Sequence, residues 1–182
     1  MVSCSYNSIE ARRIVSSLIE RLRETRVSAK DWYRGSSPTY GVFVSSSELE
    51  KAVGDLYPTV DGLSFGRINI TPIREGKGYM VDETYYFGRD RKPVEGKLPQ
   101  KPNNHPNQNV KDVAEAFGKK YGFTVNHKFS KGVYMSSTAS RLIIENRIDE
   151  LIKKIVESVV IYKNHCLKSV PLPNARNRAL RK

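Results

Sequence analysis

The sequence lacks the residue patterns of several functional classes. It has only two cysteines in 182 residues, Cys4 and Cys166, which are too few for a disulfide framework and form no CxxC zinc pair. A single bridge between these two residues stays open from the sequence alone. Because disulfides are rare in reducing compartments, the low cysteine content favours a cytoplasmic protein.

Long apolar segments are missing as well. No apolar run approaches the roughly 20 residues that a membrane-spanning helix needs. The opening residues, Met1–Tyr6, contain neither the basic nor the apolar region of a secretory signal. We therefore expect neither secretion nor a membrane partner.

The short motifs of metal sites, nucleotide sites and hydrolases are also absent. The three histidines are isolated in the sequence, with no HxH or HExxH spacing. No GxxxxGK[ST] phosphate loop and no GxSxG nucleophile motif occurs. We predict no catalytic residue, metal site or cofactor, and we favour a protein that is not an enzyme.

One catalytic alternative remains. The triplets Glu75-Gly76-Lys77 and Glu95-Gly96-Lys97 match half of a magnesium-dependent nuclease site, with Asp61 or Asp82 as the upstream carboxylate. The central glycine of each triplet favours a turn instead. A magnesium-dependent nuclease is therefore our second alternative.

Positive charge is what the sequence has in excess, and it is concentrated in the second half. The chain has 31 basic and 19 acidic residues, a formal net charge of +12. Residues 1–60 and 61–100 each have a net charge of +1, whereas residues 101–182 hold 16 basic and 6 acidic residues, a net charge of +10. Such an asymmetric charge distribution favours a polyanionic partner.

The first 92 residues are predicted to form a near-neutral α+β unit with a central hairpin. Apolar residues at a spacing of four indicate a helix that ends near Glu24. The other expected elements are strands within 26–34 and 40–44, a helix over 47–56, and hairpin strands within 63–73 and 79–87.

Residues 93–109 are rich in proline and asparagine, which predicts a linker or a long exposed loop. Residues 110–170 then read as a basic αββα-like unit, although one compact domain for the whole chain is also compatible with the sequence. Its expected elements are a helix over 110–121, strands over 123–129 and 133–135, and a long helix over 138–162. Residues 171–182, with four basic and no acidic side chains, are predicted to be a disordered tail.

A short pattern occurs twice and relates the two halves. Residues 41–47 and 132–138 both read Gly-Val-aromatic-apolar-Ser-Ser-hydroxyl, and we expect each to end a strand and cap the following helix. The predicted fold class is therefore α+β, with amphipathic helices and short antiparallel strands. Two αββα-like halves around a central hairpin are one arrangement that this repeat favours.

Basic side chains of the second half are the candidate binding residues. They would neutralise phosphates and position a nucleic acid. Lys128 and Lys131 flank a predicted hairpin turn, and Arg147 and Lys154 lie one heptad apart on the predicted long helix. The full set comprises Lys119, Lys120, Lys128, Lys131, Arg147 and Lys154. Tyr121, Phe129 and Tyr134 are either core residues or base-stacking residues.

We therefore predict non-enzymatic binding of nucleic acid or of a nucleoprotein complex. The first alternative is a small viral or mobile-element inhibitor that binds a host nucleoprotein complex. The apolar stripe of the predicted helix over 138–162 would also serve a homodimer. DNA or RNA, and single or double strands, stay open at this level.

Overall fold

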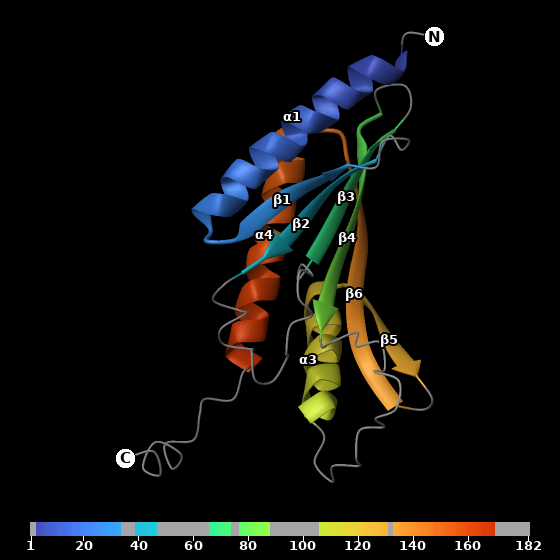
Figure 1. The fold of residues 1–182 in the computed structure, drawn as a ribbon, viewed down its shortest axis with the longest axis vertical. Helices are drawn as coiled ribbons and strands as arrows, with labels where there is room; N and C mark the ends of the chain where they lie inside the picture. The colour runs from blue at the N-terminus through green and yellow to red at the C-terminus, as the bar shows by residue number, and fades with distance from the viewer. Residues whose placement is uncertain are drawn as a thin grey trace, which may run out of the picture.

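The computed structural model describes residues 3–33, 39–46, 66–73, 77–87, 106–130 and 133–169. This part of the chain confirms the α+β class, with helices and antiparallel strands (Figure 1). The helices are α1 (Ser3–Glu24), α3 (Pro106–Tyr121) and α4 (Ile148–Ser169). The strands are β1 (Ser28–Tyr33), β2 (Tyr40–Ser45), β3 (Gly66–Pro72), β4 (Tyr79–Phe87), β5 (Thr124–Ser130) and β6 (Val133–Glu145).

The strands form one antiparallel sheet in the order β1-β2-β3-β4-β6-β5. Figure 1 shows them fanning out from one end of the molecule, as expected for a strongly twisted sheet. The predicted central hairpin is present as β3 and β4, closed by a hydrogen bond from the Ile73 N–H to the Gly78 carbonyl. Gly78 has a φ of 105°, which glycine adopts without the strain of a side chain. Pairing of β4 with β6 joins the two halves of the sequence into this sheet.

The order of elements is similar on both sides of the central hairpin. On one side, α1 leads into the edge strand β1, and β2 returns beside β3. On the other side, α3 leads into the edge strand β5, and β6 returns beside β4. The second half therefore has the predicted helix-strand-strand-helix order. The first half matches it through β2, and the helix expected over 47–56 lies outside the described residues.

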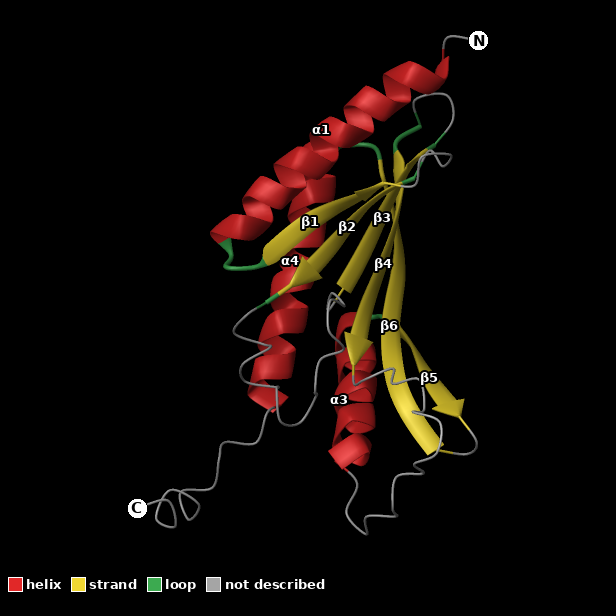
Figure 2. Cartoon of the chain, viewed as in Figure 1, coloured by secondary structure: helices red, strands yellow, loops and turns green. Residues whose placement is uncertain are grey.

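The helices bury their apolar stripes against one face of the sheet. Leu18 and Leu22 of α1, Phe117 of α3, and Leu151 and Ile155 of α4 are fully buried. α1 contacts β1, β2 and β3, whereas α3 contacts β4, β5 and β6. Figure 2 shows α1 crossing α4, with which it also packs. Apolar side chains on the facing strands complete this core.

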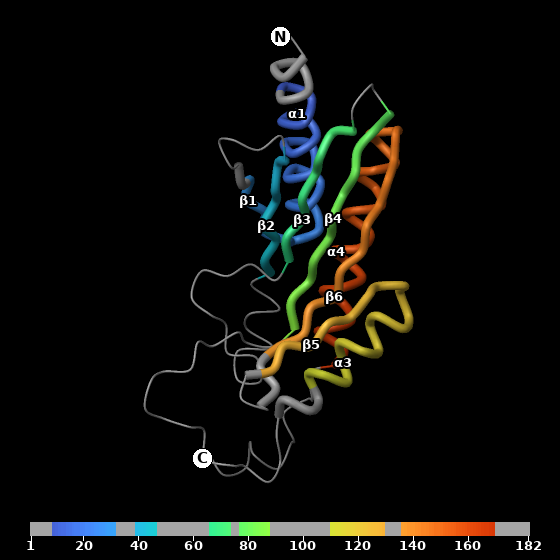
Figure 3. Tube along the Cα trace, turned by 90° about the vertical axis from the view of Figure 1, so that its right-hand side faces the viewer, coloured from blue at the N-terminus to red at the C-terminus, as the bar shows by residue number. Residues whose placement is uncertain are grey.

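Aromatic rings form the part of the core beneath α3 and α4. Tyr85 stacks on Tyr162, with ring centroids 4.7 Å apart, and meets Phe117 edge to face at 6.2 Å. Phe87 and Phe123 also contact the Phe117 ring, at 5.5 and 4.9 Å. Figure 3 shows α3 beside the β5–β6 hairpin. The cluster fixes both helices on the same face of the sheet.

The predicted long helix over 138–162 is wrong in its first third. Residues 138–145 continue β6, and α4 begins only at Ile148. β4 supplies nine consecutive partners for residues 137–145, so sheet pairing outweighs the local helical pattern. The Glu145 carboxylate then accepts hydrogen bonds from the N–H groups of Asn146 and Arg147, which marks the turn into α4.

Two further expectations change with this boundary. Ser136 and Ser137, which we expected to cap a helix, lie inside β6 and are buried. The apolar stripe considered for a homodimer packs within this chain, because Leu151, Ile155 and Val159 are buried in its core. That stripe is therefore not a free surface for a second copy.

The other described features concern the thiol and the membrane question. Cys166 is a free, buried thiol, so the bridge to Cys4 is not formed. Burial raises the pKa of Cys166 to about 12, which makes it a packing residue and not a nucleophile. Among the described residues, no helix is long and apolar enough to cross a membrane.

Candidate nucleic-acid interface

Lys119 and Lys120 lie in the last turn of α3 and are both exposed. Neither forms an ion pair with another described residue. The ammonium of Lys120 lies 5.1 Å from the centre of the Tyr121 ring. Tyr121 itself packs against Phe117 and His165, so its ring belongs to the core and not to a stacking surface.

Lys128 extends this basic surface along the edge of the sheet. It is exposed on β5, opposite Ser136 of β6. α3 packs closely on β5: a Cβ added to Gly118 would lie only 2.3 Å from Val125 Cγ2. Lys119 and Lys120 therefore lie beside the start of β5, and Lys128 lies near its end. We call this set, Lys119, Lys120 and Lys128, the β5-edge lysines.

Phe129, the next residue along β5, is 56% exposed. Of the three aromatic candidates from the sequence, it is the one that the described structure leaves at the surface. Lys131 and the side chain of Tyr134 lie outside the described residues.

Arg147 and Lys154 occupy a different place, at the start of α4. The Lys154 ammonium lies 2.5 Å from Glu145 Oε2, and Arg147 Nη2 lies 3.5 Å from Glu150 Oε1. Carboxylates thus already pair with these two cations, whereas Lys119 and Lys120 form no ion pair with a described residue. The structure thus separates the five predicted residues that it describes into two groups.

The charge of the second half is also divided. Residues 106–130 and 133–169 hold ten basic and six acidic residues, a net charge of +4. The remaining six charges of its +10 lie outside the described residues, at Lys101, Lys131, Arg176, Arg178, Arg181 and Lys182. The folded part alone is therefore only moderately basic.

The sheet has a second face, which none of the described helices covers. In β4, residues 79, 81, 83, 85 and 87 are buried toward the helices, whereas the alternate residues are partly or fully exposed. The same alternation continues through the registered neighbours in β3 and in residues 138–144 of β6. We call this surface the helix-free face. Its cations are Lys30, Arg67 and Lys128, and its one carboxylate among the described residues is Asp82.

One row of residues crosses the helix-free face over all six strands. Each member of the row is the register partner of the next member on the neighbouring strand. The row begins with Lys30 on β1, which pairs with Phe43 on β2, and it continues across β3, β4 and β6 to β5. At about 4.8 Å between strands, the row spans roughly 24 Å. We call it the cross-strand row, and its members are Lys30, Phe43, Arg67, Thr84, Ser140 and Thr124.

Within the described structure, two polar atoms on this face are buried without a hydrogen-bond partner. They are Nε of Arg67 and Oδ1 of Asn69, two residues apart on β3. A donor and an acceptor that lack partners carry a desolvation cost of about 1–3 kcal/mol each. A ligand that offers both donors and acceptors would remove that cost.

One end of the helix-free face is apolar. Met80 of β4 lies opposite Ile144 of β6, and Leu142 follows on the same side of β6. Their exposed fractions are 37%, 65% and 59%. This apolar end comprises Met80, Leu142 and Ile144. Exposed apolar side chains gathered in one place are a sign of an interaction surface.

Sequence reasoning missed the helix-free face for a traceable reason. Net charge by segment directed attention to residues 101–182, whereas Lys30, Phe43 and Arg67 come from the near-neutral segments. The alternating pattern of β3 and β4 was a usable signal, since one polar side per strand indicates a solvated face. The remaining step, the pairing of β4 with β6, required the structure.

A buried ion pair lies on the opposite, helix-covered side. Glu83 is fully buried, and its Oε2 accepts hydrogen bonds from Arg141 Nε and Nη2 at 3.2 and 2.9 Å. Arg141 Nη2 also donates to Ser158 Oγ at 2.5 Å, and its guanidinium lies 4.5 Å from the centre of the Phe123 ring. Burial raises the pKa of Glu83 to about 7, against the opposing effect of the Arg141 charge. This group ties β4, β6 and α4 together.

A serine, a histidine and a carboxylate also converge near β5. His127 Nδ1 lies 2.6 Å from Ser137 Oγ, and His127 Nε2 lies 3.1 Å from Glu115 Oε1. This order of groups is that of a nucleophile, a base and an orienting acid. Ser137 is completely buried, however, so no substrate reaches its hydroxyl. The three residues instead brace α3 against β5 and β6.

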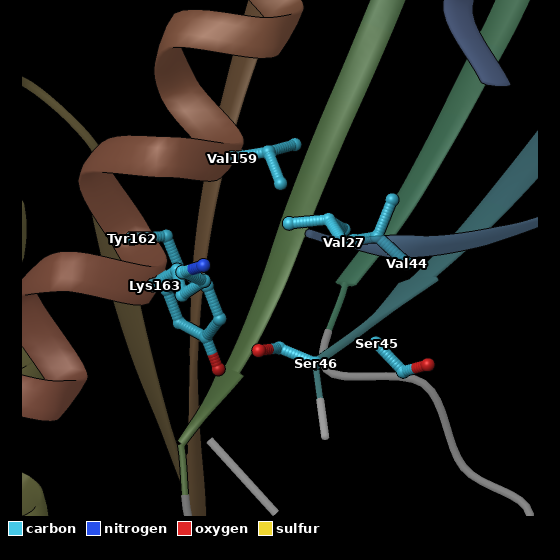
Figure 4. Close-up of a pocket in the computed structure, with 7 residues that line it drawn as sticks. All are labelled: Val27, Val44, Ser45, Ser46, Val159, Tyr162 and Lys163. Atoms are coloured by element: carbon cyan, nitrogen blue, oxygen red, sulfur yellow. The ribbon is translucent and has the colours of Figure 1, made fainter. Parts of the chain in front are cut away.

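A shallow, narrow depression lies between α4 and the β1–β2 side of the sheet. Figure 4 shows Val159 and Tyr162 of α4 facing Val27 and Val44 across it, with Ser46 at the lower edge. The ammonium of Lys163, also in its lining, donates to the Thr25 carbonyl at 3.2 Å. The lining is mostly apolar and offers no group of convergent ionisable side chains.

Acidic and metal-ligating residues do not converge in the described part of the chain, where no group of three or more His, Cys, Asp or Glu residues is found. Asp82, one carboxylate of the nuclease alternative, accepts a weak hydrogen bond from Thr84 at 3.5 Å. Glu75, Asp61 and the triplet at 95–97 lie outside the described residues. The nuclease alternative thus stays a hypothesis.

Comparison with known proteins gives no relative from which a function can be carried over. No protein-family model matches the sequence, and neither the curated proteins nor the solved structures gave a match. The function is therefore argued from the residues and their geometry.

Proposed function

We propose that this protein binds nucleic acid without catalysis, through phosphate contacts that include the β5-edge lysines. The net charge of +10 in residues 101–182 supports an anionic partner. The observation that carries the proposal is the position of Lys119 and Lys120, which are adjacent, exposed and not ion-paired within the described structure.

The contrast with Arg147 and Lys154 supports this choice of residues. An ion-paired lysine must first give up its carboxylate before it neutralises a phosphate, whereas an unpaired lysine exchanges only water and salt ions. Release of condensed counterions then drives binding at low salt. Lys119 and Lys120 are therefore expected to contribute more to affinity than the two cations at the start of α4.

The test is the salt dependence of binding to random-sequence DNA and RNA. We expect the logarithm of the association constant to fall linearly with the logarithm of salt concentration. Replacing both Lys119 and Lys120 by alanine should lower the magnitude of that slope by about 1.4 for single strands, at about 0.7 per phosphate contact. Absence of binding at low salt would remove the proposal.

A charge-matched control is available on α1. Arg13 and Arg23 are exposed and outside every ion pair of the described structure, so Arg13→Ala with Arg23→Ala removes the same charge from another place. If this control lowers the slope as much as the lysine variant does, the protein binds through net charge alone and not through the β5-edge lysines.

The second candidate is an interaction protein that binds a protein surface of a nucleoprotein complex. The apolar end of the helix-free face favours it, because Leu142 and Ile144 are more than half exposed. Such a partner would be retained at high salt, where nucleic-acid binding through phosphates is lost. Salt therefore separates the two candidates.

A further inference from the structure

We infer that the nucleic acid is single-stranded and lies along the cross-strand row of the helix-free face. The inference rests on the proposed function and deepens it by naming the ligand class and the surface. A duplex is convex and rigid, whereas an extended single strand can follow a sheet and present its bases to it. The row combines the two kinds of group that this mode of binding uses.

The first kind is a cation that contacts the backbone. Lys30 and Arg67 flank Phe43 in register on neighbouring strands, and Lys128 lies on the same face at β5. Asp82 is the one carboxylate among the described residues of this face. The excess of positive charge gives the face an attraction for phosphates that does not depend on base sequence.

The second kind is an aromatic ring on which a base stacks. Phe43 and Tyr86 lie on this face and are both partly exposed, unlike Tyr85 and Phe87, which point into the core. From the spacing of strands and of residues along a strand, the two positions are roughly 12 Å apart. A base stacked on such a ring gains about 1–3 kcal/mol regardless of its identity.

The polar atoms without partners add a third argument. Nε of Arg67 and Oδ1 of Asn69 lie beside the row, within the described structure, with their hydrogen-bonding capacity unused. Base edges carry both donors and acceptors, so a base that reaches β3 can satisfy either atom after a small side-chain adjustment. A simple polyanion offers acceptors only and would leave Asn69 Oδ1 unpaired.

The path of the single-stranded nucleic acid links the helix-free face to the proposed phosphate contacts. The cross-strand row ends at Thr124, on the edge strand β5. Thr124 follows Lys119 and Lys120 by a few residues, and Gly118 packs against Val125. A single strand that leaves the face at this edge therefore meets the β5-edge lysines.

The experiment measures the affinity of the full chain for three labelled probes of equal length: oligo-dT, oligo-rU and a random-sequence DNA duplex. Fluorescence anisotropy at low salt gives the affinity of each. We expect both single strands to bind at least tenfold more tightly than the duplex. Equal or tighter binding of the duplex would overturn the inference while leaving the proposed function in place.

Variants at the row then test the location. Phe43→Ala should weaken single-strand binding by roughly 5- to 100-fold. Phe43→Leu preserves the apolar volume without the ring, so it separates loss of stacking from loss of folding, and it should also weaken binding. If Phe43→Leu folds normally and binds both single strands as tightly as the native chain does, the inference fails.

A matched pair of lysines supplies the control. Lys30 lies on the helix-free face and Lys153 on the helix side, and both are exposed. Lys30→Ala should lower the salt slope for oligo-dT by about 0.7, and Lys153→Ala should leave it unchanged. If only Lys119→Ala with Lys120→Ala lowers the slope, the proposed function stands and the helix-free face is not the site. If no probe binds, both proposals fall.

Discussion

The two faces of the sheet differ in what their side chains do for the fold. On the helix-covered face, alternate residues of β4 meet α3 and α4, and Tyr85 and Phe87 are fully or almost fully buried. On the helix-free face, the intervening residues include Met80, which is 37% exposed. In β4, one set of alternate side chains thus stabilises the core, and the other set forms part of the surface.

This difference between the two faces shows which residues can be substituted with little loss of stability. Residues that pack under a helix are constrained by volume, and substitutions there create cavities or strain. Residues on a solvated face are constrained mainly by β propensity. Side chains on the helix-free face are therefore less constrained by packing than those under the helices.

The largest expected effect compares an apolar residue from each face. Phe117→Ala removes a ring that contacts five Tyr or Phe rings in the core, so it should lower the free energy of unfolding by about 3–5 kcal/mol. Leu142→Ala should change it by less than about 0.5 kcal/mol, because its side chain is 59% exposed. Urea unfolding measures both. Equal losses would mean that the helix-free face is packed as tightly as the core.

The next largest effect is a pH dependence of stability, which should come from Glu83 on the helix-covered face. The pKa of Glu83 is raised from 4.5 to about 7 in the folded state, so the folded chain binds the proton more tightly than the unfolded chain. The stabilisation of the fold by protonated Glu83 is therefore complete below about pH 4.5 and is lost as the pH rises through 7. The loss is roughly 3 kcal/mol, at about 1.4 kcal/mol per pKa unit.

Two isosteric variants on β4 test this pH dependence. Glu83→Gln cannot ionise, so unfolding experiments from pH 5 to pH 8 should show a flatter profile than the native chain gives. Asp82→Asn, at the neighbouring position on the helix-free face, is the matched control for removal of one carboxylate from β4. A Glu83→Gln profile as steep as the native one would show that another group causes the dependence.

A smaller effect concerns the fit between α3 and β5. Gly118→Ala places a Cβ 2.3 Å from Val125 Cγ2 and 2.8 Å from the Phe123 carbonyl oxygen, so α3 must shift. We expect a loss of about 1–3 kcal/mol in the free energy of unfolding. Ala116→Ser, at an exposed position on the same helix, should stay within about 0.5 kcal/mol and serves as the control. A neutral Gly118→Ala would show that the contact is loose.

Much of the fold followed from periodicity in the sequence. Apolar residues spaced by four predicted α1 and α3, and alternation predicted the β3–β4 hairpin and β5. The boundary between β6 and α4 could not be found this way. Ile144 continues the apolar stripe of α4 at a spacing of four from Ile148, so the helical pattern extends into β6, and only pairing with β4 decides between helix and strand.

The candidate site was less accessible to sequence reasoning. Lys119, Lys120 and Lys128 could be selected from charge, and the structure places them along one edge of the sheet. Ion pairing of Arg147 and Lys154 depends on where Glu145 and Glu150 lie relative to α4, and this is set by the corrected boundary. The cross-strand row needed the complete strand order, because its six residues come from all six strands.

Photo-crosslinking tests the central claim most directly. A single-stranded oligonucleotide with 5-iodouracil at each position is bound to the full chain, irradiated, and the attached peptides are identified by mass spectrometry. The account predicts crosslinks at Phe43 or Tyr86 on the helix-free face. Crosslinks confined to peptides of α1 and α4, with none from β2 or β4, would contradict it.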